Sequence, residues 1–526
     1  MSQTAAGGDN FDLVFIGGGV STLYTLLGLA SRLTSGPAPG NRKLRIAIIE
    51  QSPDGLGGVP YTGRSSYTSL LITALRQFLP DAERALFVTW LNANKHWMFD
   101  GFRQHQPGAL SVGWLEKHHQ EIEAGRWEDL YLPRYLFGLY MNQRVQNAMA
   151  GAELAYEFQQ ICQRVTGVAR QGDGFEVELA DSKVQAAALV LAVGSPPNSA
   201  RFSIPAGVST DGALLIEDPY EIGLAATIDR IEAILTRSTD ASPEILLIGA
   251  GASTMDLLYV LHDRLQIARP DVQFTILAPS GQLPDRIKDP ANTIPFHTAT
   301  LHALAQQDMV TARQIYEAAA RDIELGQASG LTTCDMLSPI SVAVDALVKR
   351  LNAAEQLEFA TKWGTAVGRL QRRAGPEYLD VATELIAQAR LQIIGGRFRR
   401  VVSLSPEGAA VEYEDHGNTR QLPRRQRVIV NCAGFAMISD LPTDHLLRHL
   451  TAGGLVKPTS SGTGLQVNDR MEATEGLFIL GPLLAGNVIA GMPVWHVEHC
   501  GRISAFAARL ADVLNQQLAG VWNKLA

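Results

Sequence analysis

Two glycine-rich turns of one design, far apart in the chain, constrain its fold more than any other feature. The first follows an apolar run at 12–16 and the second follows a run at 244–248. Each turn leads into an apolar stretch of helical character, at 22–33 and 255–265. A buried strand that ends in Gly-x-Gly and opens a helix is the unit that holds a dinucleotide pyrophosphate. Because the unit occurs twice, the sequence predicts two bound nucleotides.

The residues of each turn have separate tasks. The first glycine, Gly17 or Gly249, makes the tight turn, and the second, Gly19 or Gly251, lets the backbone approach the phosphates. The helix N-terminus adds free N–H groups and a partial positive charge. The usual chemistry of two such sites is a flavin reduced by a nicotinamide coenzyme. The predicted ligands are therefore Gly17, Gly19, Ser21 and Thr22 for FAD, and Gly249, Gly251, Ser253 and Thr254 for the coenzyme.

An acid closes the next predicted strand of the first unit. The run at 43–49 ends at Glu50, where a carboxylate can accept the ribose hydroxyls of the adenosine half of FAD. The distance from Gly17 is longer than usual because the segment 35–41 has the composition of a loop. We expect Glu50 to bind the ribose; an exposed strand-end acid without a role is the alternative.

Composition bounds the class of protein. A chain of 526 residues, with 46% hydrophobic and 19% charged residues, predicts two or three ordinary globular domains. The net charge of −8 argues against a general nucleic-acid or anionic-membrane binder. A polar N-terminus and the lack of a long apolar run predict no signal peptide and no membrane span, so the cytoplasm is the expected location.

The four cysteines argue against several kinds of site. Cys162, Cys334, Cys432 and Cys500 are scattered and form no Cys-x-x-Cys pair. A zinc site, a disulfide framework and a redox disulfide are therefore not expected, and no metal is predicted. We expect each of these cysteines to be a packed thiol.

The fold class predicted is α/β, with two Rossmann-like three-layer dinucleotide-binding domains, a discontinuous FAD domain and a helical insertion. The FAD domain is expected at 1–215 and 396–526, and the NAD(P) domain at 216–395 with the insertion at about 298–392. Later strands are predicted at 187–194, 427–435 and 476–482, and a closing helix at about 496–518.

Several further segments resemble a known group of proteins. These segments are 55–61, 87–91 and 132–140, the strand-to-glycine end at Gly194, and the run Cys432-Ala433-Gly434-Phe435. The chain resembles the two-dinucleotide flavoproteins of the FAD/NAD(P)-binding family, which are related to the N-hydroxylating and Baeyer–Villiger flavin monooxygenases. The run at 432–435 is similar to the Ala-Thr-Gly-Tyr signature of the N-hydroxylating group. The resemblance implies FAD contacts at Gly58 and Gly194, reduction by NADPH or NADH, and oxygen activation at the flavin.

The sequence departs from the family pattern at three places. Thr22 and Thr254 replace the third glycine of each turn, which implies looser helix-to-strand packing without loss of phosphate binding. Gly481-Pro482 stands where relatives carry Gly-Asp, so the backbone of these two residues is expected to meet FAD in place of the acid.

Arg134 lies among apolar residues and needs an anionic partner. A flavin phosphate, a substrate carboxylate and an internal Asp or Glu are equal alternatives for that partner. Arg134 is counted here among the predicted FAD contacts.

The choice of coenzyme depends on the end of the second strand of the second unit. The sequence there is Ala278-Pro279-Ser280-Gly281, without an acid that would repel a 2′-phosphate, and Arg286 and Lys288 follow. NADPH is therefore favoured, with Ser280 and Arg286 as predicted contacts, and NADH remains the alternative coenzyme. The alternative interpretation is that Arg286 is an ordinary surface arginine. The pair of arginines at 372–373 is a further candidate for contact with the coenzyme.

The function expected is an FAD-dependent, NADPH-using monooxygenase that hydroxylates a small polar substrate, such as an amine nitrogen of an amino acid, with molecular oxygen. In such an enzyme the cofactor performs the chemistry, and no catalytic side chain is assigned. His496 and His499 follow the glycine-rich segment 486–491, where a helix start near the flavin and simple packing are equal alternatives. A flavin oxidoreductase serving a carrier or quinone, and a non-catalytic FAD-binding protein, are the alternative functions. Self-association is left open.

Overall fold

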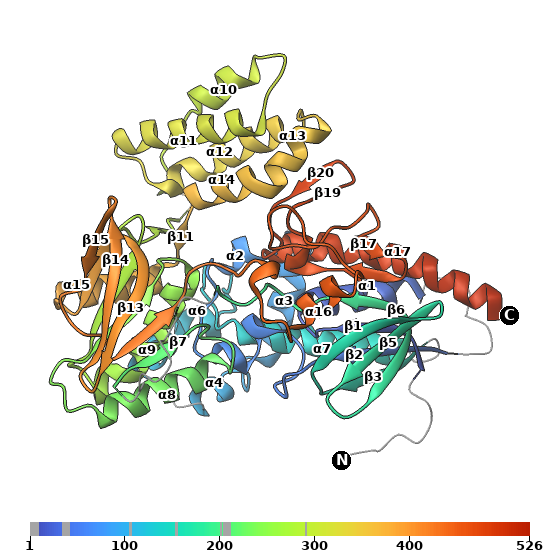
Figure 1. Cartoon of the computed structure of the whole chain (residues 1–526), viewed down its shortest axis with the longest axis horizontal. Coiled ribbons are helices and arrows are strands. Elements are labelled where there is room, and N and C mark those ends of the chain that lie inside the picture. The colour runs from blue at the N-terminus through green and yellow to red at the C-terminus, as the bar shows by residue number, and fades with distance from the viewer. Residues whose placement is uncertain are drawn as a thin grey trace.

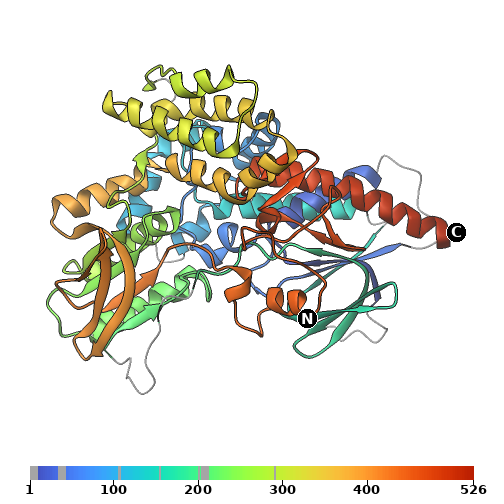
Figure 2. The ribbon, with the colours of Figure 1, turned by 45° about the horizontal axis from the view of Figure 1, so that its top comes forward.

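The computed structural model describes residues 10–33, 43–104, 108–152, 156–199, 202, 212–289 and 292–525. Two α/β units lie side by side, and a body of helices stands above them (Figure 1). The same three bodies remain distinct when the molecule is turned (Figure 2). This arrangement confirms the predicted α/β class with two dinucleotide-binding units.

The first unit is built on a sheet whose central strands are parallel. Its order is β17-β18-β6-β1-β2-β3, and β4 and β5 form a hairpin beside β6. The strand order reverses between β1 and β6, and ligands bind at such a point, outside the carboxyl ends of the strands. The strands are β1 (Asn10–Ile16), β2 (Leu44–Ile49), β3 (Tyr156–Ile161), β4 (Val165–Gln171), β5 (Gly174–Leu179), β6 (Lys183–Leu191), β17 (Glu472–Thr474) and β18 (Leu477–Ile479).

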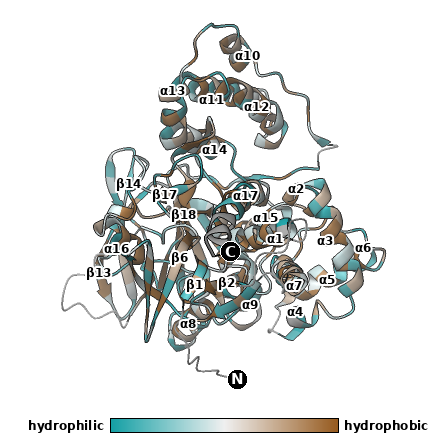
Figure 3. Cartoon of the chain, turned by 90° about the vertical axis from the view of Figure 1, so that its right-hand side faces the viewer, coloured by the Kyte–Doolittle hydropathy of each residue, from teal (hydrophilic) through white to brown (hydrophobic). Residues whose placement is uncertain are grey.

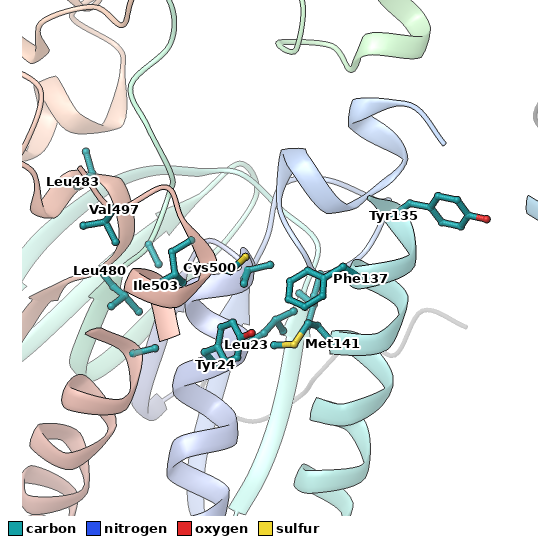
Figure 4. Close-up of a cluster of buried hydrophobic side chains, with 14 of the residues drawn as sticks. Leu23, Tyr24, Tyr135, Phe137, Met141, Leu480, Leu483, Val497, Cys500 and Ile503 are labelled. Carbon is teal, nitrogen blue, oxygen red and sulfur yellow. The ribbon is translucent and has the colours of Figure 1, made fainter. Parts of the chain in front are cut away.

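Three long helices cover this sheet and form much of its core. Figure 4 shows side chains of α1 (Val20–Leu33), α7 (Tyr135–Gly151) and α17 (Cys500–Leu525) meeting beside the strands. Leu23 and Phe137 are fully buried, and burying a side chain of this size stabilises the fold by about 1.5–3 kcal/mol. The C-terminal helix was expected at 496–518 and begins four residues later. The remaining helices of this unit are α2 (Leu75–Phe78), α3 (Asp81–Asn94), α4 (Asp100–Gln104), α5 (Ala109–Lys117), α6 (His119–Glu123) and α16 (Leu446–Ala452).

The second unit has a five-stranded, fully parallel sheet. Its order is β12-β9-β8-β16-β7. The order reverses between β8 and β16, which repeats the arrangement of the first unit. The strands are β7 (Leu214–Ile216), β8 (Glu244–Ile248), β9 (Gln273–Ala278), β12 (Leu391–Gly395) and β16 (Val428–Asn431), and the helices are α8 (Leu224–Arg237), α9 (Ala252–Ala268) and α15 (Pro376–Ala387).

The two faces of the second sheet are covered differently. Leu246 and Ile429 face an antiparallel sheet of β13 (Arg397–Ser405), β14 (Gly408–Asp415) and β15 (Asn418–Gln421), where Val411 is fully buried. Ile245 and Val430 belong to the core formed with the helices on the other face. The alternation of strand side chains between two faces explains this pattern. The second unit therefore has three layers, one of which is a β-meander.

The sheet pairing corrects the predicted domain boundary at 396. Residues after 395 were assigned to the FAD domain, but β16 pairs with both β8 and β7, and β13–β15 pack on the second sheet. The second unit therefore extends to Asn431. The chain returns to the first sheet at β17 and β18, as expected for a discontinuous first unit.

The helical insertion is shorter than predicted. It contains α10 (Ala299–Ala305), α11 (Ala312–Ala328), α12 (Thr333–Val348), α13 (Ala353–Glu358), a π-helix (Phe359–Trp363) and α14 (Gly364–Leu370). The expected end at 392 is wrong because α15 packs on α9 and β12 pairs with β9, so both belong to the second unit. The short parallel pair of β10 (Asp285–Arg286) and β11 (Arg373–Ala374) joins the two connecting segments.

The insertion has a hydrophobic core of its own, and apolar and polar residues alternate around its helices (Figure 3). It meets the first unit at Trp495, whose ring lies 5.1 Å from that of Phe359. A Cβ atom on Gly364 would stand 2.5 Å from Trp495 Cγ, so a glycine is required at this contact. Trp495 follows the hairpin of β19 (Asn487–Ile489) and β20 (Met492–Val494).

Three of the four cysteines are packed as expected, but Cys162 is exposed. It lies directly after β3, which is an edge strand of the first sheet among the described residues. No helix in the described ranges combines the length and apolarity needed to cross a bilayer.

Candidate functional site: two dinucleotide cradles

The first glycine turn closes against the neighbouring strand end. Gly17 adopts φ +104°, and its N–H donates to the Ile49 carbonyl oxygen at 2.9 Å. A Cβ atom at Gly17 would stand 2.4 Å from the Ala192 carbonyl oxygen, so only glycine fits. Gly19 has open space where a Cβ would be. The turn is therefore packed on the protein side and open at the position expected to face the pyrophosphate.

Glu50 is tied to this turn by both carboxylate oxygens. Oε2 accepts a hydrogen bond from the Gly18 N–H at 2.8 Å, and Oε1 accepts one from the Ser52 N–H at 2.9 Å. The residue is buried at the carboxyl end of β2, beside β1. Each oxygen retains a second lone pair, so the geometry accommodates the predicted ribose contact.

A second glycine segment completes the first cradle. Gly57 forms a parallel bridge with Gly19, and a Cβ on Gly58 would lie 3.2 Å from the Gly19 Cα. On another side, Gly481 adopts φ +78° and approaches the Ser21 hydroxyl. The structure thus brings five predicted FAD residues together around the N-terminus of α1: Gly17, Gly19, Ser21, Gly58 and Gly481. Gly18 and Gly57 were not predicted as site residues, although they lie within the glycine runs 17–19 and 55–58 that the sequence displays.

Gly194 and Pro482 lie at the ends of the strands that flank this cradle. Gly194 follows β6, adopts φ +84° and has open space at its Cβ position. Pro482 is the second residue of a short 3-10 helix, Gly481–Leu484, that follows β18 after one residue. The backbone of Gly481 and Pro482 therefore stands where relatives carry an acid.

The third-position threonines have the same task in both turns. The Thr22 hydroxyl donates to the Gly17 carbonyl oxygen at 2.7 Å, and the Thr254 hydroxyl donates to the Gly249 carbonyl oxygen at 2.8 Å. Both threonines are fully buried. Each hydroxyl therefore closes its turn through a hydrogen bond, and the looser helix-to-strand packing stays a prediction.

The second turn repeats the first with more room. Gly249 has φ +103°, and its N–H donates to the Leu277 carbonyl oxygen at 2.8 Å. A Cβ there would stand 3.1 Å from the Cys432 carbonyl oxygen, and Gly251 has open space. Ser253 is half-buried in the first turn of α9.

A cavity of about 520 Å³ opens at the carboxyl ends of the second sheet. Gly249, Pro279 and Ala433 line it, which is the position expected for a dinucleotide. Two arginines of β13 also line it, Arg397 and Arg399, and Arg399 pairs with the Glu414 carboxylate. Neither arginine was named from the sequence, because β13 lies more than a hundred residues beyond the turn.

The predicted 2′-phosphate contacts lie outside the lining of this cavity. Arg286 forms an exposed ion pair with Asp380, and Lys288 Nζ lies 2.8 Å from the buried carboxylate of Asp335. The exposed Ser280 hydroxyl lies in a local turn and donates to the Gln282 carbonyl oxygen at 3.3 Å. Within the described residues, these side chains are engaged by local partners.

Arg134 has an internal acid as its partner, which was one of three alternatives. Its Nη2 lies 2.5 Å from Asp256 Oδ2, and its Nε donates to the Ser65 hydroxyl at 3.1 Å. Burial opposes the charge, but Asp256 and the hydroxyls of Tyr220 and Tyr378 raise the pKa of Arg134 above its usual value. The arginine remains charged and joins the two units, since Asp256 lies in α9.

The loops after β6 and β16 join the two cradles. The N–H of Ser199 donates to the Gly434 carbonyl oxygen at 3.1 Å, and the N–H of Ala436 donates to the Pro197 carbonyl oxygen at 2.8 Å. Asn198 and Phe435 form the antiparallel bridge between these bonds. The loops that follow the carboxyl ends of β6 and β16 therefore pair directly with each other.

One of the late histidines, His499, lies at the start of α17. His499 Nδ1 accepts a hydrogen bond from the Gly501 N–H at 3.1 Å, so His499 caps the helix. Burial and the nearby Arg502 lower the pKa of His496 to about 4. Among the described residues, no group of His, Cys, Asp and Glu side chains is arranged to hold a metal ion.

Comparisons with known proteins agree with this geometry. Residues 14–196 match the family model described as FAD-NAD(P)-binding. An uncharacterised protein of Mycobacterium tuberculosis is 29% identical over 523 residues, which cover 97% of this chain and 96% of that protein.

Two solved structures share the fold. An ornithine N-hydroxylase of Kutzneria sp. 744 has 16% identity, covers 96% of this chain and 98% of its own, and gives a TM-score of 0.50. The cadaverine monooxygenase of Erwinia amylovora, bound to FAD, has 13% identity, covers 96% of this chain and 94% of its own, and gives a TM-score of 0.52.

Residues 14–196 are therefore similar to FAD-NAD(P)-binding domains, and the chain as a whole shares its fold with these two monooxygenases. The resemblance predicted from the sequence is confirmed.

Proposed function

We propose that the protein is an FAD-dependent, NADPH-using monooxygenase that hydroxylates an amine nitrogen of a small polar substrate, such as an amino acid or a diamine. The observation that carries the proposal is the pairing of the loops 197–199 and 434–436, which leave the carboxyl ends of the two sheets. Hydride transfer requires a flavin bound to the first unit and a coenzyme bound to the second to approach one another, and this pairing holds the two units together on the side where both nucleotides are expected. The signature-like run 432–435 forms part of this junction.

The residues of the chain would bind and orient both nucleotides. The open positions at Gly19 and Gly251 leave room for a pyrophosphate against the N-termini of α1 and α9, where N–H groups and the helix dipole favour anions. Glu50 fixes the Gly18 peptide and offers lone pairs to a ribose. When bound, FAD would supply the chemistry, namely hydride acceptance from the nicotinamide and activation of molecular oxygen.

Coenzyme choice would depend on charge at the cavity beside Gly249. Arg397 and Arg399 bring two positive charges and Glu414 one negative charge, and Arg399 neutralises Glu414. Arg397 therefore leaves a net positive charge at the cavity, and no ion pair of Arg397 occurs among the described residues. We add Arg397 to Ser280 and Arg286 as a candidate contact of the NADPH 2′-phosphate.

An anaerobic spectrum tests the proposal. Purified protein should be yellow, NADPH should bleach the flavin absorbance near 450 nm without oxygen, and admitted air should restore it. Fast dye or quinone reduction with slow reaction toward oxygen would indicate electron transfer to a carrier instead. Tight flavin that neither NADPH nor NADH bleaches would indicate a non-catalytic FAD-binding protein and contradict the proposal.

A further inference from the structure

Helix α9 carries two buried aspartates on one face. Asp256 and Asp263 are each 2% exposed, and they are seven residues apart. Seven residues make almost two helical turns, so both side chains leave α9 in the same direction. The same helix begins at Gly251, where the coenzyme pyrophosphate is expected.

Asp256 binds the first unit through Arg134, and two tyrosine hydroxyls of its own unit also contact its carboxylate. Arg134 reaches it from the start of α7, and the Tyr220 hydroxyl donates to Oδ2 at 2.7 Å. The Tyr378 hydroxyl lies 3.3 Å from Oδ1 and donates to the Leu70 carbonyl oxygen in the first unit at 2.7 Å. Burial and Asp256 raise the pKa values of Tyr220 and Tyr378 well above the usual range, so both phenols keep their protons.

Asp263 holds the N-terminus of α5, which belongs to the first unit. Its Oδ1 accepts hydrogen bonds from the N–H groups of Leu110 at 2.8 Å and Ser111 at 3.2 Å. The Ser111 hydroxyl donates to Oδ2. A carboxylate at a helix N-terminus is also favoured by the helix dipole. A Cβ on Gly108 would stand 2.0 Å from the Asp263 carbonyl oxygen, which shows how closely the two units approach here.

These contacts oppose rotation of the second unit relative to the first. Units joined by small polar interfaces are expected to move relative to one another. Here a rotation of the second unit would separate Asp256 from Arg134 and so break a buried ion pair. It would also remove Asp263 from the end of α5. One domain arrangement is therefore strongly preferred.

We propose that Asp256 and Asp263 are positioning residues that lock the coenzyme unit on the FAD unit, so that NADPH reduces the flavin without domain rotation. The inference rests on the proposed function for its coenzyme and flavin. It goes beyond that function because it assigns a fixed geometry to the reductive step and names the residues that hold it.

A disulfide between the two units tests directly whether they stay in one arrangement during flavin reduction. The contacts of Asp256 and Asp263 between the units are called the lock below. The Cβ position of Gly223 in the second unit lies 4.0 Å from the Cβ of Arg64 in the first unit. Disulfides join Cβ atoms about 3.5–4.5 Å apart, so Arg64→Cys with Gly223→Cys should cross-link the two units. The exposed Cys162 is replaced by serine in the same background to prevent side reactions. Because Gly223 has φ +91°, the single variant Gly223→Cys controls for backbone strain.

The lock predicts that the disulfide forms completely on mild oxidation. Anaerobic flavin reduction at saturating NADPH should then proceed within about twofold of the rate of the same protein after thiol reduction. A loss of tenfold or more that thiol reductant reverses would show that the units must rotate, and would overturn the proposal. Failure to cross-link when both single variants fold would overturn it as well.

Asp256→Asn provides a second readout. This variant should keep its FAD but reduce the flavin at least tenfold more slowly at saturating NADPH, with the Kd for NADP⁺ changed less than threefold. Unchanged reduction with only a lower melting temperature would show a structural role and contradict the positioning role. If NADPH fails to bleach the unaltered protein, the proposed function fails, whereas the extent of cross-linking still reports on the lock.

Discussion

The two glycine turns share one design but differ in what surrounds them. In the first turn, the Gly18 N–H donates a hydrogen bond to Glu50, and a Cβ at Gly17 would stand 2.4 Å from the Ala192 carbonyl oxygen. In the second turn, no acid stands at the strand end near Pro279. A Cβ at Gly249 would stand 3.1 Å from the nearest backbone oxygen, and a cavity of about 520 Å³ lies beside this residue. The first site therefore has the tight construction of a permanent cofactor site. The second has the open construction that suits a coenzyme which exchanges.

Exchanging the second glycine of each turn for valine should give the largest effects. Gly19→Val places a branched side chain where the FAD pyrophosphate is expected, so the purified variant should be colourless while its secondary structure persists, because no protein atom lies within 4 Å of the new Cβ. Gly251→Val is the matched control and should retain flavin but raise the NADPH concentration for half-maximal reduction tenfold or more. Flavin absorbance and anaerobic titration measure both. Full flavin in Gly19→Val would reverse the assignment of the two sites.

The crowding difference predicts unequal costs for the first glycines. Gly17→Ala should lower the free energy of unfolding by about 3 kcal/mol or more, because the methyl group meets a backbone oxygen at a positive φ. Gly249→Ala should lower it by about 1–2 kcal/mol, mainly through its positive φ. Urea unfolding of both apo-proteins compares them. Equal costs would mean that the first turn is no tighter than the second.

Removal of Arg397 should affect only the second site. Arg397→Ala should raise the Michaelis constant for NADPH about tenfold and leave that for NADH nearly unchanged, which corresponds to about 1.4 kcal/mol for the phosphate contact. Arg286→Ala is the matched variant, and its exposed pairing with Asp380 predicts a smaller change. The reverse order of effects would restore Arg286 as the main phosphate contact.

The similarity of the turns predicts equal effects at the threonines. Thr22→Val and Thr254→Val each remove one buried hydrogen bond to the first glycine and should each cost about 1–2 kcal/mol of unfolding free energy. Thermal or urea unfolding gives the values. A clearly larger cost at one site would show that its turn depends more on this bond.

A further prediction concerns the pH dependence of stability. Because burial and Arg502 lower the pKa of His496 to about 4, the folded protein keeps this imidazole neutral where the unfolded chain, with a pKa near 6.5, becomes protonated. The contribution of His496 to stability is therefore complete above about pH 6.5 and is lost as the pH falls toward 4, with a slope of at most about 1.4 kcal/mol per pH unit. His496→Gln should unfold with a weaker pH dependence than the unaltered protein between pH 4.5 and 7. Identical slopes would mean that His496 does not contribute.

Local features of the sequence predicted both turns, the strand ends and Glu50, since each depends on residues close in the chain. The boundary at 396 was misplaced because β13–β15 separate β16 from its partner strands, and the hydrophobic pattern of a buried strand does not say which sheet it joins. The insertion was extended to 392 because α15 has the same helical periodicity as its neighbours.

Long-range partners were the part that the sequence could not supply. Arg134 clearly needed an anion, but Asp256 lies 122 residues further on and only the packing of α9 on the first unit brings them together. Arg397 likewise reaches the second cradle only through the register of the meander.

The central claim is that two nucleotides meet in one chain to hydroxylate a substrate with oxygen. Its most direct test measures NADPH consumed, hydrogen peroxide released and hydroxylated product formed by the holoprotein with a panel of amino acids and diamines. A monooxygenase with this arrangement should oxidise NADPH faster with at least one amine and yield hydroxylamine product in nearly equal amount, with little peroxide. Peroxide equal to NADPH consumed for every amine, without product, would contradict the monooxygenase function.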